Sequence, residues 1–241
     1  MLTAHLHPDV LIVVSEISDG SMKLGAPPQT GVQWAAQREV VRARRRLLRA
    51  ADLDPALAVR VHVTYDTADF CRYRAVGSDE RSRGIGRDDG QDATTASDAL
   101  ATDQPGVGLL LPVADCMPVV AYDHVRRVVA LTHLGRHSVE QRGGARTIAW
   151  MAEHFGSRPG DVSAWLGPAP SGSSYPLHRC GGRSFDDEVT RQLTAAGVPP
   201  QQLVHSAIDT ATDRRFFSHS EFLAGRRPVD GRYAVVAALR A

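Results

Sequence analysis

Three side chains that can do chemistry, Asp115, Cys116 and His133, lie where apolar runs of the sequence end. The first run, residues 107–122, is rich in β-forming apolar residues, and Ala-Asp-Cys-Met-Pro interrupts it at residues 114–118. The second run, residues 128–135, carries His133 near its end. A rigid sheet holds side chains at strand ends while they face a cleft, as metal binding and nucleophilic chemistry both require. We therefore expect the active centre here.

A second histidine, His62, completes a His/Cys/His set with Cys116 and His133. It lies in the segment 59–63, whose alternation is typical of a half-buried strand. Two imidazoles and one thiolate suit a borderline-soft ion such as zinc, and three protein ligands leave a fourth position for water or substrate. Such an ion would lower the pKa of its bound water towards about 7, which produces a nucleophile at neutral pH.

Two other interpretations of the same residues stay open. Strand histidines and a buried cysteine are often core groups, because free cysteine packs as a small hydrophobe. Alternatively, Cys116 is a nucleophile and His133 is its base, which requires the two side chains to lie within hydrogen-bonding distance. Asp115 could then orient either partner, or simply cap the turn.

The elements that must position these groups alternate between strands and helices. Apolar runs predict further buried strands, and periodic apolar positions predict helices that end or begin at suitable caps, Gly156 and Ser184 among them. The expected strands are residues 10–14, 59–63, 163–166 and 233–239, and the expected helices are residues 32–51, 144–155 and a segment that begins after Ser184. This alternation indicates an α/β or α+β domain with a covered sheet.

The longest expected helix, residues 32–51, is amphipathic. Its apolar positions recur near helical spacing, and arginines occupy the remaining positions. Charge runs of this kind usually face water, so we expect the arginines to form a basic, solvated outer face. The apolar face consists of Val32, Ala36, Val40, Val41, Leu47 and Leu48.

Length and composition set the outer limits. The 241 residues are 43% hydrophobic and 23% charged, which predicts a single globular domain over residues 1–241, with a long, mobile loop at about 74–97 where large apolar residues are scarce. The net charge of +1 argues against a strong grip on nucleic acid or an anionic membrane. No apolar run approaches the roughly 20 residues of a membrane span, and no signal segment is evident. We therefore expect a soluble, cytoplasmic protein that binds neither nucleic acid nor membrane.

Cysteine and histidine usage also bears on function. Three cysteines, Cys71, Cys116 and Cys180, are an odd number at wide spacing, so a disulfide framework is not expected and at least one thiol should be free. A true multicopper oxidase is the least favoured class, because the chain has one candidate cluster rather than the many histidine pairs that several copper ions need.

The same residues carry a resemblance to a known family. Residues 97–120, with Ala-Asp-Cys-Met-Pro, and Thr-His-Leu-Gly at residues 132–135 resemble the signature of the laccase-domain family, also called the polyphenol oxidase family or peptidoglycan editing factor. The family's Gly-Pro loop and tyrosine are similar to residues 165–168 and Tyr175, and its late Phe-Phe-Ser segment is similar to residues 216–218. The resemblance covers most of the chain from Val59 to Leu239.

The resemblance implies a fold, a metal site and an activity. The implied fold is α+β, with layered mixed sheets flanked by helices, similar to the catalytic domain of cytotoxic necrotizing factor toxins. By residue matching, His62, Cys116 and His133 fall on the family's metal ligands, with zinc expected and copper less favoured. The implied activity is zinc-dependent phosphorolysis or hydrolysis of purine nucleosides such as adenosine, with phosphate as a possible second substrate, beside an older polyphenol oxidase (laccase) label.

Several positions depart from the family pattern. Where the family has Trp-Arg-Gly, this chain has Arg136-His137-Ser138, so His137 occupies the usual arginine position and Arg136 lies one position early. A neutral histidine cannot replace a bidentate guanidinium at a phosphate. Arg136, His137 and Tyr175 are the expected substrate-binding residues of a divergent member.

Three hypotheses from different classes follow: a metal-dependent nucleoside phosphorylase or hydrolase, a Cys116/His133 hydrolase without metal, and a catalytically degenerate binding protein that kept the scaffold. Bound zinc that is lost on Cys116→Ser would favour the first. A metal-free, fast-reacting thiol would favour the second.

Overall fold

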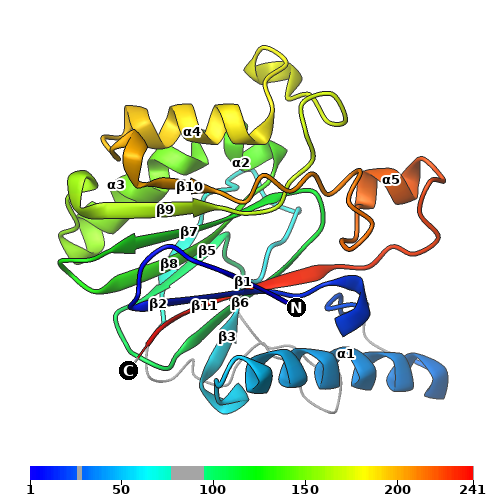
Figure 1. Cartoon of the computed structure of the whole chain (residues 1–241). Helices are drawn as coiled ribbons and strands as arrows, with labels where there is room; N and C mark the ends of the chain where they lie inside the picture. Colours follow the sequence, from blue (N-terminus) through cyan, green and yellow to red (C-terminus); the bar gives the residue numbers. More distant parts are fainter. Residues whose placement is uncertain (26–28, 77–94, 241) are drawn as a thin grey trace.

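Two mixed β-sheets lie face to face at the centre of the molecule, with helices on their outer sides (Figure 1). The computed structural model describes residues 1–25, 29–76 and 95–240. The five-stranded sheet has the order β1-β2-β11-β6-β3, and the six-stranded sheet has the order β10-β9-β7-β8-β5-β4. The strands are β1 Leu2–Ala4, β2 Val10–Val14, β3 Ala58–Arg60, β4 Tyr73–Ala75, β5 Ala99–Thr102, β6 Gly108–Val113, β7 Met117–Asp123, β8 Val128–Leu134, β9 Val162–Leu166, β10 Leu203–His205 and β11 Tyr233–Leu239. The expected α+β class, with mixed sheets flanked by helices, is confirmed.

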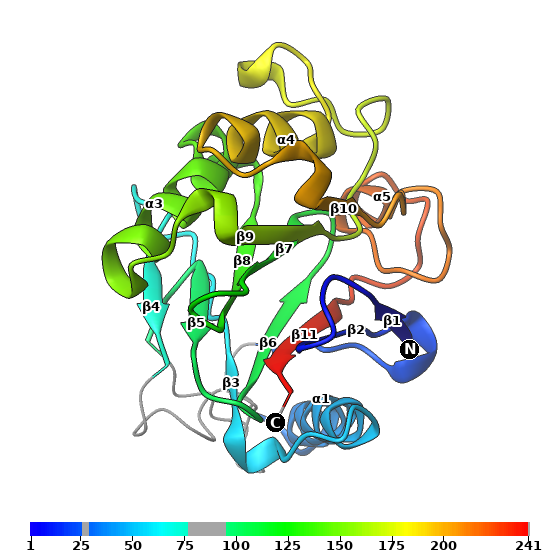
Figure 2. The ribbon, with the colours of Figure 1, turned by 60° about the vertical axis from the view of Figure 1, so that its left-hand side comes forward.

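The helices cover the two outer faces of this sandwich. In the turned view α1 lies beside the five-stranded sheet, and α3 and α4 lie over the six-stranded sheet (Figure 2). The α-helices are α1 Gly31–Ala50, α2 Arg136–Glu140, α3 Gly143–Phe155, α4 Phe185–Ala195 and α5 His219–Leu223. Among the described residues no helix is both long and apolar enough to cross a membrane.

Three apolar layers hold the sheets and helices together. One layer fills the space between the sheets, where Leu109, Leu111, Leu131 and Val235 are almost fully buried. The neighbouring residues along these strands face the opposite way, because side chains alternate in a strand. They form the second layer under α3 and α4 and the third layer under α1. Both sheets are therefore covered on both faces, which explains why β2, β7, β8 and β11 read as continuous apolar runs.

Most expected elements are present, and two details differ. Val10–Val14 and Tyr233–Leu239 are strands with the expected bounds, and Ser184 caps α4 through a hydrogen bond from the Asp187 backbone N–H at 3.0 Å. The strand expected at residues 59–63 ends at Arg60, so His62 lies beyond it. The predicted strand was therefore wrong over residues 61–63. The backbone N–H of Val61 still donates to the Leu110 carbonyl oxygen of β6 at 2.8 Å, and the chain leaves the sheet after this bond.

The buried face of helix α1 differs from the expected one. Val32 is 81% exposed and Ala36 is also exposed, so the expected apolar face begins only at Val41. Arg44 is 1% exposed, whereas a solvated arginine was expected. Its Nε and Nη2 donate to the Met22 carbonyl oxygen at 3.1 and 2.7 Å, which satisfies a charge that water would otherwise hydrate.

The segment expected to be a loop over residues 74–97 falls largely outside the described residues. Within its described ends, Arg74 and Ala75 belong to β4, and Val76 is buried in the layer between the sheets. Organisation as a single domain stays a prediction, as does the likeness to the cytotoxic necrotizing factor domain. All three cysteines are free, which agrees with the expectation of at least one free thiol.

Candidate active site

The turn that carries Asp115 and Cys116 crosses from one sheet to the other. It joins β6 of the five-stranded sheet to β7 of the six-stranded sheet. Asp115 has a φ of +70°, in the left-handed region that aspartate adopts more readily than most residues. The turn is therefore sharp, and it presents Cys116 at the edge of the space between the sheets.

The carboxylate of Asp115 holds a different part of the chain in place. It accepts a hydrogen bond from the Thr210 hydroxyl at 3.0 Å and another from the backbone N–H of Ser220 at 2.7 Å. Ser220 lies in the first turn of α5, so the carboxylate fixes that helix against the turn. We expected Asp115 to orient Cys116 or His133, or to cap the turn. It bonds to neither side chain, so Asp115 is a positioning residue.

Cys116 and His133 lie on either side of Gly135. A Cβ atom on Gly135 would stand 3.1 Å from Cys116 Sγ, 3.0 Å from His133 Cε1 and 3.4 Å from His133 Nε2. Both side chains therefore crowd one point, and only glycine leaves room for them there. β7 and β8 pair with Pro118 opposite His133, which brings this thiol and this imidazole close together. No hydrogen bond joins the two side chains, although the nucleophile–base hypothesis requires one.

Burial sets the protonation of both groups. Burial raises the pKa of the Cys116 thiol to about 12, Asp115 adds to the rise, and Arg232, Arg136 and the Tyr65 hydroxyl oppose it. Burial lowers the pKa of His133 to about 4, although Asp98 acts in the opposite direction. At neutral pH the pair is a thiol and a neutral imidazole. A nucleophilic cysteine needs a depressed pKa, so this environment does not activate Cys116 in the way that the metal-free hydrolase hypothesis requires.

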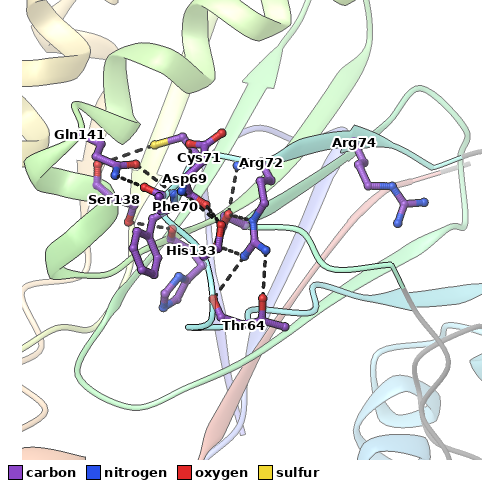
Figure 3. A network of polar contacts seen from close by, with 12 residues as sticks. Thr64, Asp69, Phe70, Cys71, Arg72, Arg74, His133, Ser138 and Gln141 are labelled. Carbon is purple, nitrogen blue, oxygen red and sulfur yellow. Dashed lines mark hydrogen bonds and ion pairs between the residues drawn. The ribbon is translucent and has the colours of Figure 1, made fainter.

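An ion pair between Arg72 and Asp98 supports the segment that carries His133. Figure 3 labels Arg72, Thr64 and His133 of this network. The Asp98 carboxylate, 1% exposed, accepts from Arg72 Nε at 2.8 Å and Nη2 at 3.2 Å, and from the Arg72 backbone N–H. The Asp98 carbonyl oxygen accepts from the His133 backbone N–H at 2.8 Å. Arg72 Nη1 also donates to the Thr64 hydroxyl at 2.9 Å. The pair thus ties β8 to the chain that follows His62.

The ring of His133 retains one unused polar atom. Its Nδ1 is buried and has no hydrogen-bond partner among the described residues. A buried polar atom without a partner costs about 1–3 kcal/mol. Such an atom beside a cavity is therefore a candidate contact for a bound ligand or an ordered water molecule.

A cavity of about 530 Å³ opens onto this pair, and it contains the expected substrate-binding residues. Arg136, His137 and Tyr175 all line it. Arg136 forms no hydrogen bond or ion pair with any residue in the described part of the chain. The His137 ring stacks on Phe70 with 4.7 Å between centroids. The cavity therefore combines apolar ring surfaces with an uncompensated guanidinium.

Several lining residues were missed by the sequence analysis. They come from segments in which no motif was recognised, and their meeting depends on the tertiary fold. The aspartate, glycine and arginine at residues 230–232, directly before an apolar run, were the one local signal available. The missed lining residues are Lys23, Arg44, Arg60, Tyr65, Phe70, His219 and Arg232. By contrast, Arg215 pairs with Asp213 at 2.7 Å and does not line the cavity.

The His/Cys/His set does not come together as a metal site. His62 is half-buried and does not line the cavity, whereas Val61 and Val63 on either side of it do. Across residues 1–25, 29–76 and 95–240, no group of three or more His, Cys, Asp or Glu side chains is gathered closely enough to hold a metal ion. Cys116 and His133 offer two donors of the type that zinc prefers, but a catalytic zinc site has three protein ligands. The described residues therefore do not fit the expected zinc site.

Comparisons with known proteins give the wider context. The solved structures of hypothetical protein YfiH from Bacillus licheniformis and of YlmD from Geobacillus stearothermophilus both superpose with a TM-score of 0.78. Their identities are 24% and 21%, over 99% of this chain and over 99% and 94% of theirs, so they share the fold.

Curated relatives match a shorter stretch. A purine nucleoside phosphorylase of Corynebacterium glutamicum is 40% identical over 101 residues, which are 42% of this chain and 40% of that protein. The purine nucleoside phosphorylase YlmD of Bacillus subtilis is 34% identical over 119 residues, which are 49% of this chain and 40% of that protein. The matched stretch thus covers about two fifths of each relative.

A family model described as multi-copper polyphenol oxidoreductase laccase matches residues 30–190. This stretch includes the Asp115–Cys116 turn, His133 and the Arg136 segment. The chain therefore belongs to the multi-copper polyphenol oxidoreductase laccase family.

Proposed function

We propose that the protein cleaves the glycosidic bond of adenosine-like purine nucleosides and transfers the sugar to phosphate. The observation that carries the proposal is the cavity of about 530 Å³ that joins Cys116, His133 and Arg136. Ligand sites of about 300–1,000 Å³ suit small molecules, so a nucleoside fits this volume. The names of the relatives, purine nucleoside phosphorylases, support the same substrate class.

The cavity walls suit the two halves of such a reaction. Phe70, His137 and Tyr65 supply ring surfaces on which a purine base can stack. Five of the lining residues, Lys23, Arg44, Arg60, Arg136 and Arg232, carry a permanent positive charge, against one lining carboxylate, Asp115. Asp115 keeps its negative charge, and Asp230 behind Lys23 and Arg232 adds a second one. The five cations still outnumber these two carboxylates, so the net field in the cavity favours an anion such as phosphate.

The proposed reaction forms one bond and breaks one. An oxygen of hydrogenphosphate attacks C1′ of the sugar, and the bond from C1′ to the base breaks with its electron pair passing to the base. The proton of hydrogenphosphate ends on the base, so the products are the free base and the sugar 1-phosphate. Fixed cations lower the barrier by holding the phosphate and by opposing negative charge in a site shielded from water. The thiol of Cys116 and the imidazole of His133 can donate hydrogen bonds towards the departing base.

Zinc has no step in this proposal, because the described residues supply two donors rather than three. A hydrolase that uses Cys116 as its nucleophile is less well supported, since burial raises the pKa of that thiol to about 12. A catalytically silent binding protein is the remaining alternative.

A nucleoside panel tests the proposal. Purified protein is incubated with adenosine, inosine, guanosine and their 2′-deoxy forms, with and without phosphate, and free base is measured by chromatography. We expect base release that depends on phosphate and falls at least tenfold in Cys116→Ser and His133→Asn. Cys180→Ser is the matched control, because Cys180 is a free, half-buried cysteine outside the cavity lining. Release without phosphate would indicate hydrolysis, and silence across the panel would overturn the proposal.

A further inference from the structure

Three basic side chains from separate segments meet around one carboxylate at the wall of the cavity. Asp230 Oδ2 accepts from Lys23 Nζ, and Asp230 Oδ1 accepts from His219 Nδ1 at 2.9 Å and from Arg232 Nη1 at 2.6 Å. Lys23, His219 and Arg232 line the cavity, whereas Asp230 does not. The carboxylate therefore lies behind the three basic groups, which face the cavity in front of it.

This cluster has more positive charge than its carboxylate can balance. Lys23 and Arg232 carry two permanent charges, so one carboxylate leaves an excess of one even when His219 is neutral. Burial by itself would raise the pKa of Asp230, but the hydrogen bonds from Lys23, Arg232 and His219 outweigh it and hold that pKa well below its usual value. Asp230 is thus ionised at neutral pH and holds the three donors in fixed positions.

The cluster also keeps unused donors. Arg232 Nε and Nη2 donate to no residue in the described part of the chain, and His219 Nε2 has no partner there either. The ammonium of Lys23 has three protons, and one of them is directed at Asp230. An oxyanion in the cavity could therefore receive hydrogen bonds from all three side chains while Asp230 keeps its own.

The backbone beneath the cluster is held firmly. The Met22 N–H donates to the Arg232 carbonyl oxygen at 2.8 Å, and the Arg232 N–H donates to Ser21 Oγ at 3.2 Å. On the other side, the buried Arg44 guanidinium donates to the Met22 carbonyl oxygen. Lys23 and Arg232 therefore belong to two segments that are hydrogen-bonded to each other. Little reorganisation of the backbone is needed when a ligand binds.

We propose that Lys23, Arg232 and His219, held by Asp230, form an oxyanion subsite that binds inorganic phosphate within the cavity. The inference rests on the proposed function and names the groups that hold its second substrate. They supply positive charge in a chain whose His137 occupies the position of a family arginine. Asp230 is a positioning residue, since it lies outside the cavity wall.

Direct binding tests the subsite without any need for activity. Titration calorimetry with inorganic phosphate is run on the parent protein, Lys23→Met and Arg232→Met, with Arg226→Met as the matched control. Arg226 is exposed, pairs with Glu221 at 2.6 Å and is not among the lining residues. We expect the Kd for phosphate to rise at least tenfold in the first two variants and to stay within twofold in the control. Lys23→Met changes a partly exposed side chain and should fold normally even if Arg232→Met does not.

The outcomes separate this inference from the proposed function. Unchanged phosphate affinity in Lys23→Met, whether or not the protein releases base, would overturn the subsite. Lost phosphate affinity in a protein that releases no base would leave the subsite standing and overturn the function. Adenosine 5′-monophosphate is titrated in parallel. Binding of the nucleotide without binding of phosphate would overturn inorganic phosphate as the ligand. In an active enzyme the KM for phosphate should rise in Lys23→Met while the KM for the nucleoside stays within twofold.

Discussion

Replacing Asp115 by asparagine tests two effects of its carboxylate, one on the stability of the fold and one on the pKa of Cys116. The carboxylate accepts from the Thr210 hydroxyl at 3.0 Å and from the Ser220 N–H at 2.7 Å, and the side chain is 5% exposed. Hydrogen bonds to a charged group contribute about 1.5–3 kcal/mol each. Asparagine keeps one acceptor oxygen but directs an N–H₂ group at the other donor. We therefore expect Asp115→Asn to lower the free energy of unfolding by about 2–4 kcal/mol. Asparagine also tolerates the positive φ, so the turn itself should survive.

The same substitution should also change the pKa of the Cys116 thiol. Asp115 raises the pKa of the thiol, so its removal should lower that pKa from about 12, although burial keeps it above the ordinary value. The assay is urea unfolding together with the alkylation rate of Cys116 between pH 8 and pH 10, measured by mass spectrometry. Thr210→Val is the control, since it removes one hydrogen bond and leaves the charge in place. We expect Thr210→Val to lose stability without faster alkylation. Equal stability of Asp115→Asn and the parent, or equal acceleration in both variants, would refute the reasoning.

Three further predictions concern the groups around His133. Asp98→Asn leaves Arg72 without its carboxylate and should reduce stability by about 3 kcal/mol in urea unfolding, whereas Asp69→Asn, at an exposed pair, should change it by less than about 1 kcal/mol. Similar losses in both variants would contradict the role of burial. The unfolded chain protonates His133 near pH 6.5 and the folded chain only near pH 4, so stability should fall by about 3 kcal/mol as the pH falls between these values. In His133→Asn the free energy of unfolding should depend less steeply on pH over this range. An unchanged pH dependence in the variant would exclude His133 as its source. Any zinc found by elemental analysis should disappear in His133→Asn and persist in His62→Asn. Loss in both would indicate that all three ligands assemble.

Features of the structure that depend on residues close together in the sequence could be predicted from it. Val10–Val14 and Tyr233–Leu239 were predicted with their bounds because a strand covered on both faces reads as an unbroken apolar run. The Ser184 cap was predicted because it involves one side chain and a backbone N–H three residues away. The meeting of Cys116 and His133 was predicted from strand ends, because β7 and β8 are neighbours joined by a short connection.

The remaining features depend on long-range contacts. Lys23, His219 and Arg232 come from three segments, and the local sequence at residues 230–232 does not reveal that Asp230 is their common partner. The helical spacing of Arg44 predicted a solvated side chain. Its guanidinium is instead buried and donates to the carbonyl oxygen of Met22, a residue outside the helix. His62 was placed at the site by its likeness to a family motif and by strand alternation, but the strand ends at Arg60.

The most direct measurement is the rate of adenine release from adenosine, with and without phosphate, by the parent protein and by His133→Asn. We expect release by the parent only when phosphate is present, formation of ribose 1-phosphate in equal amount, and a rate at least tenfold lower in the variant. Adenine release that does not depend on phosphate, or that is equally fast without the His133 imidazole, would contradict a phosphorolytic centre in this cavity.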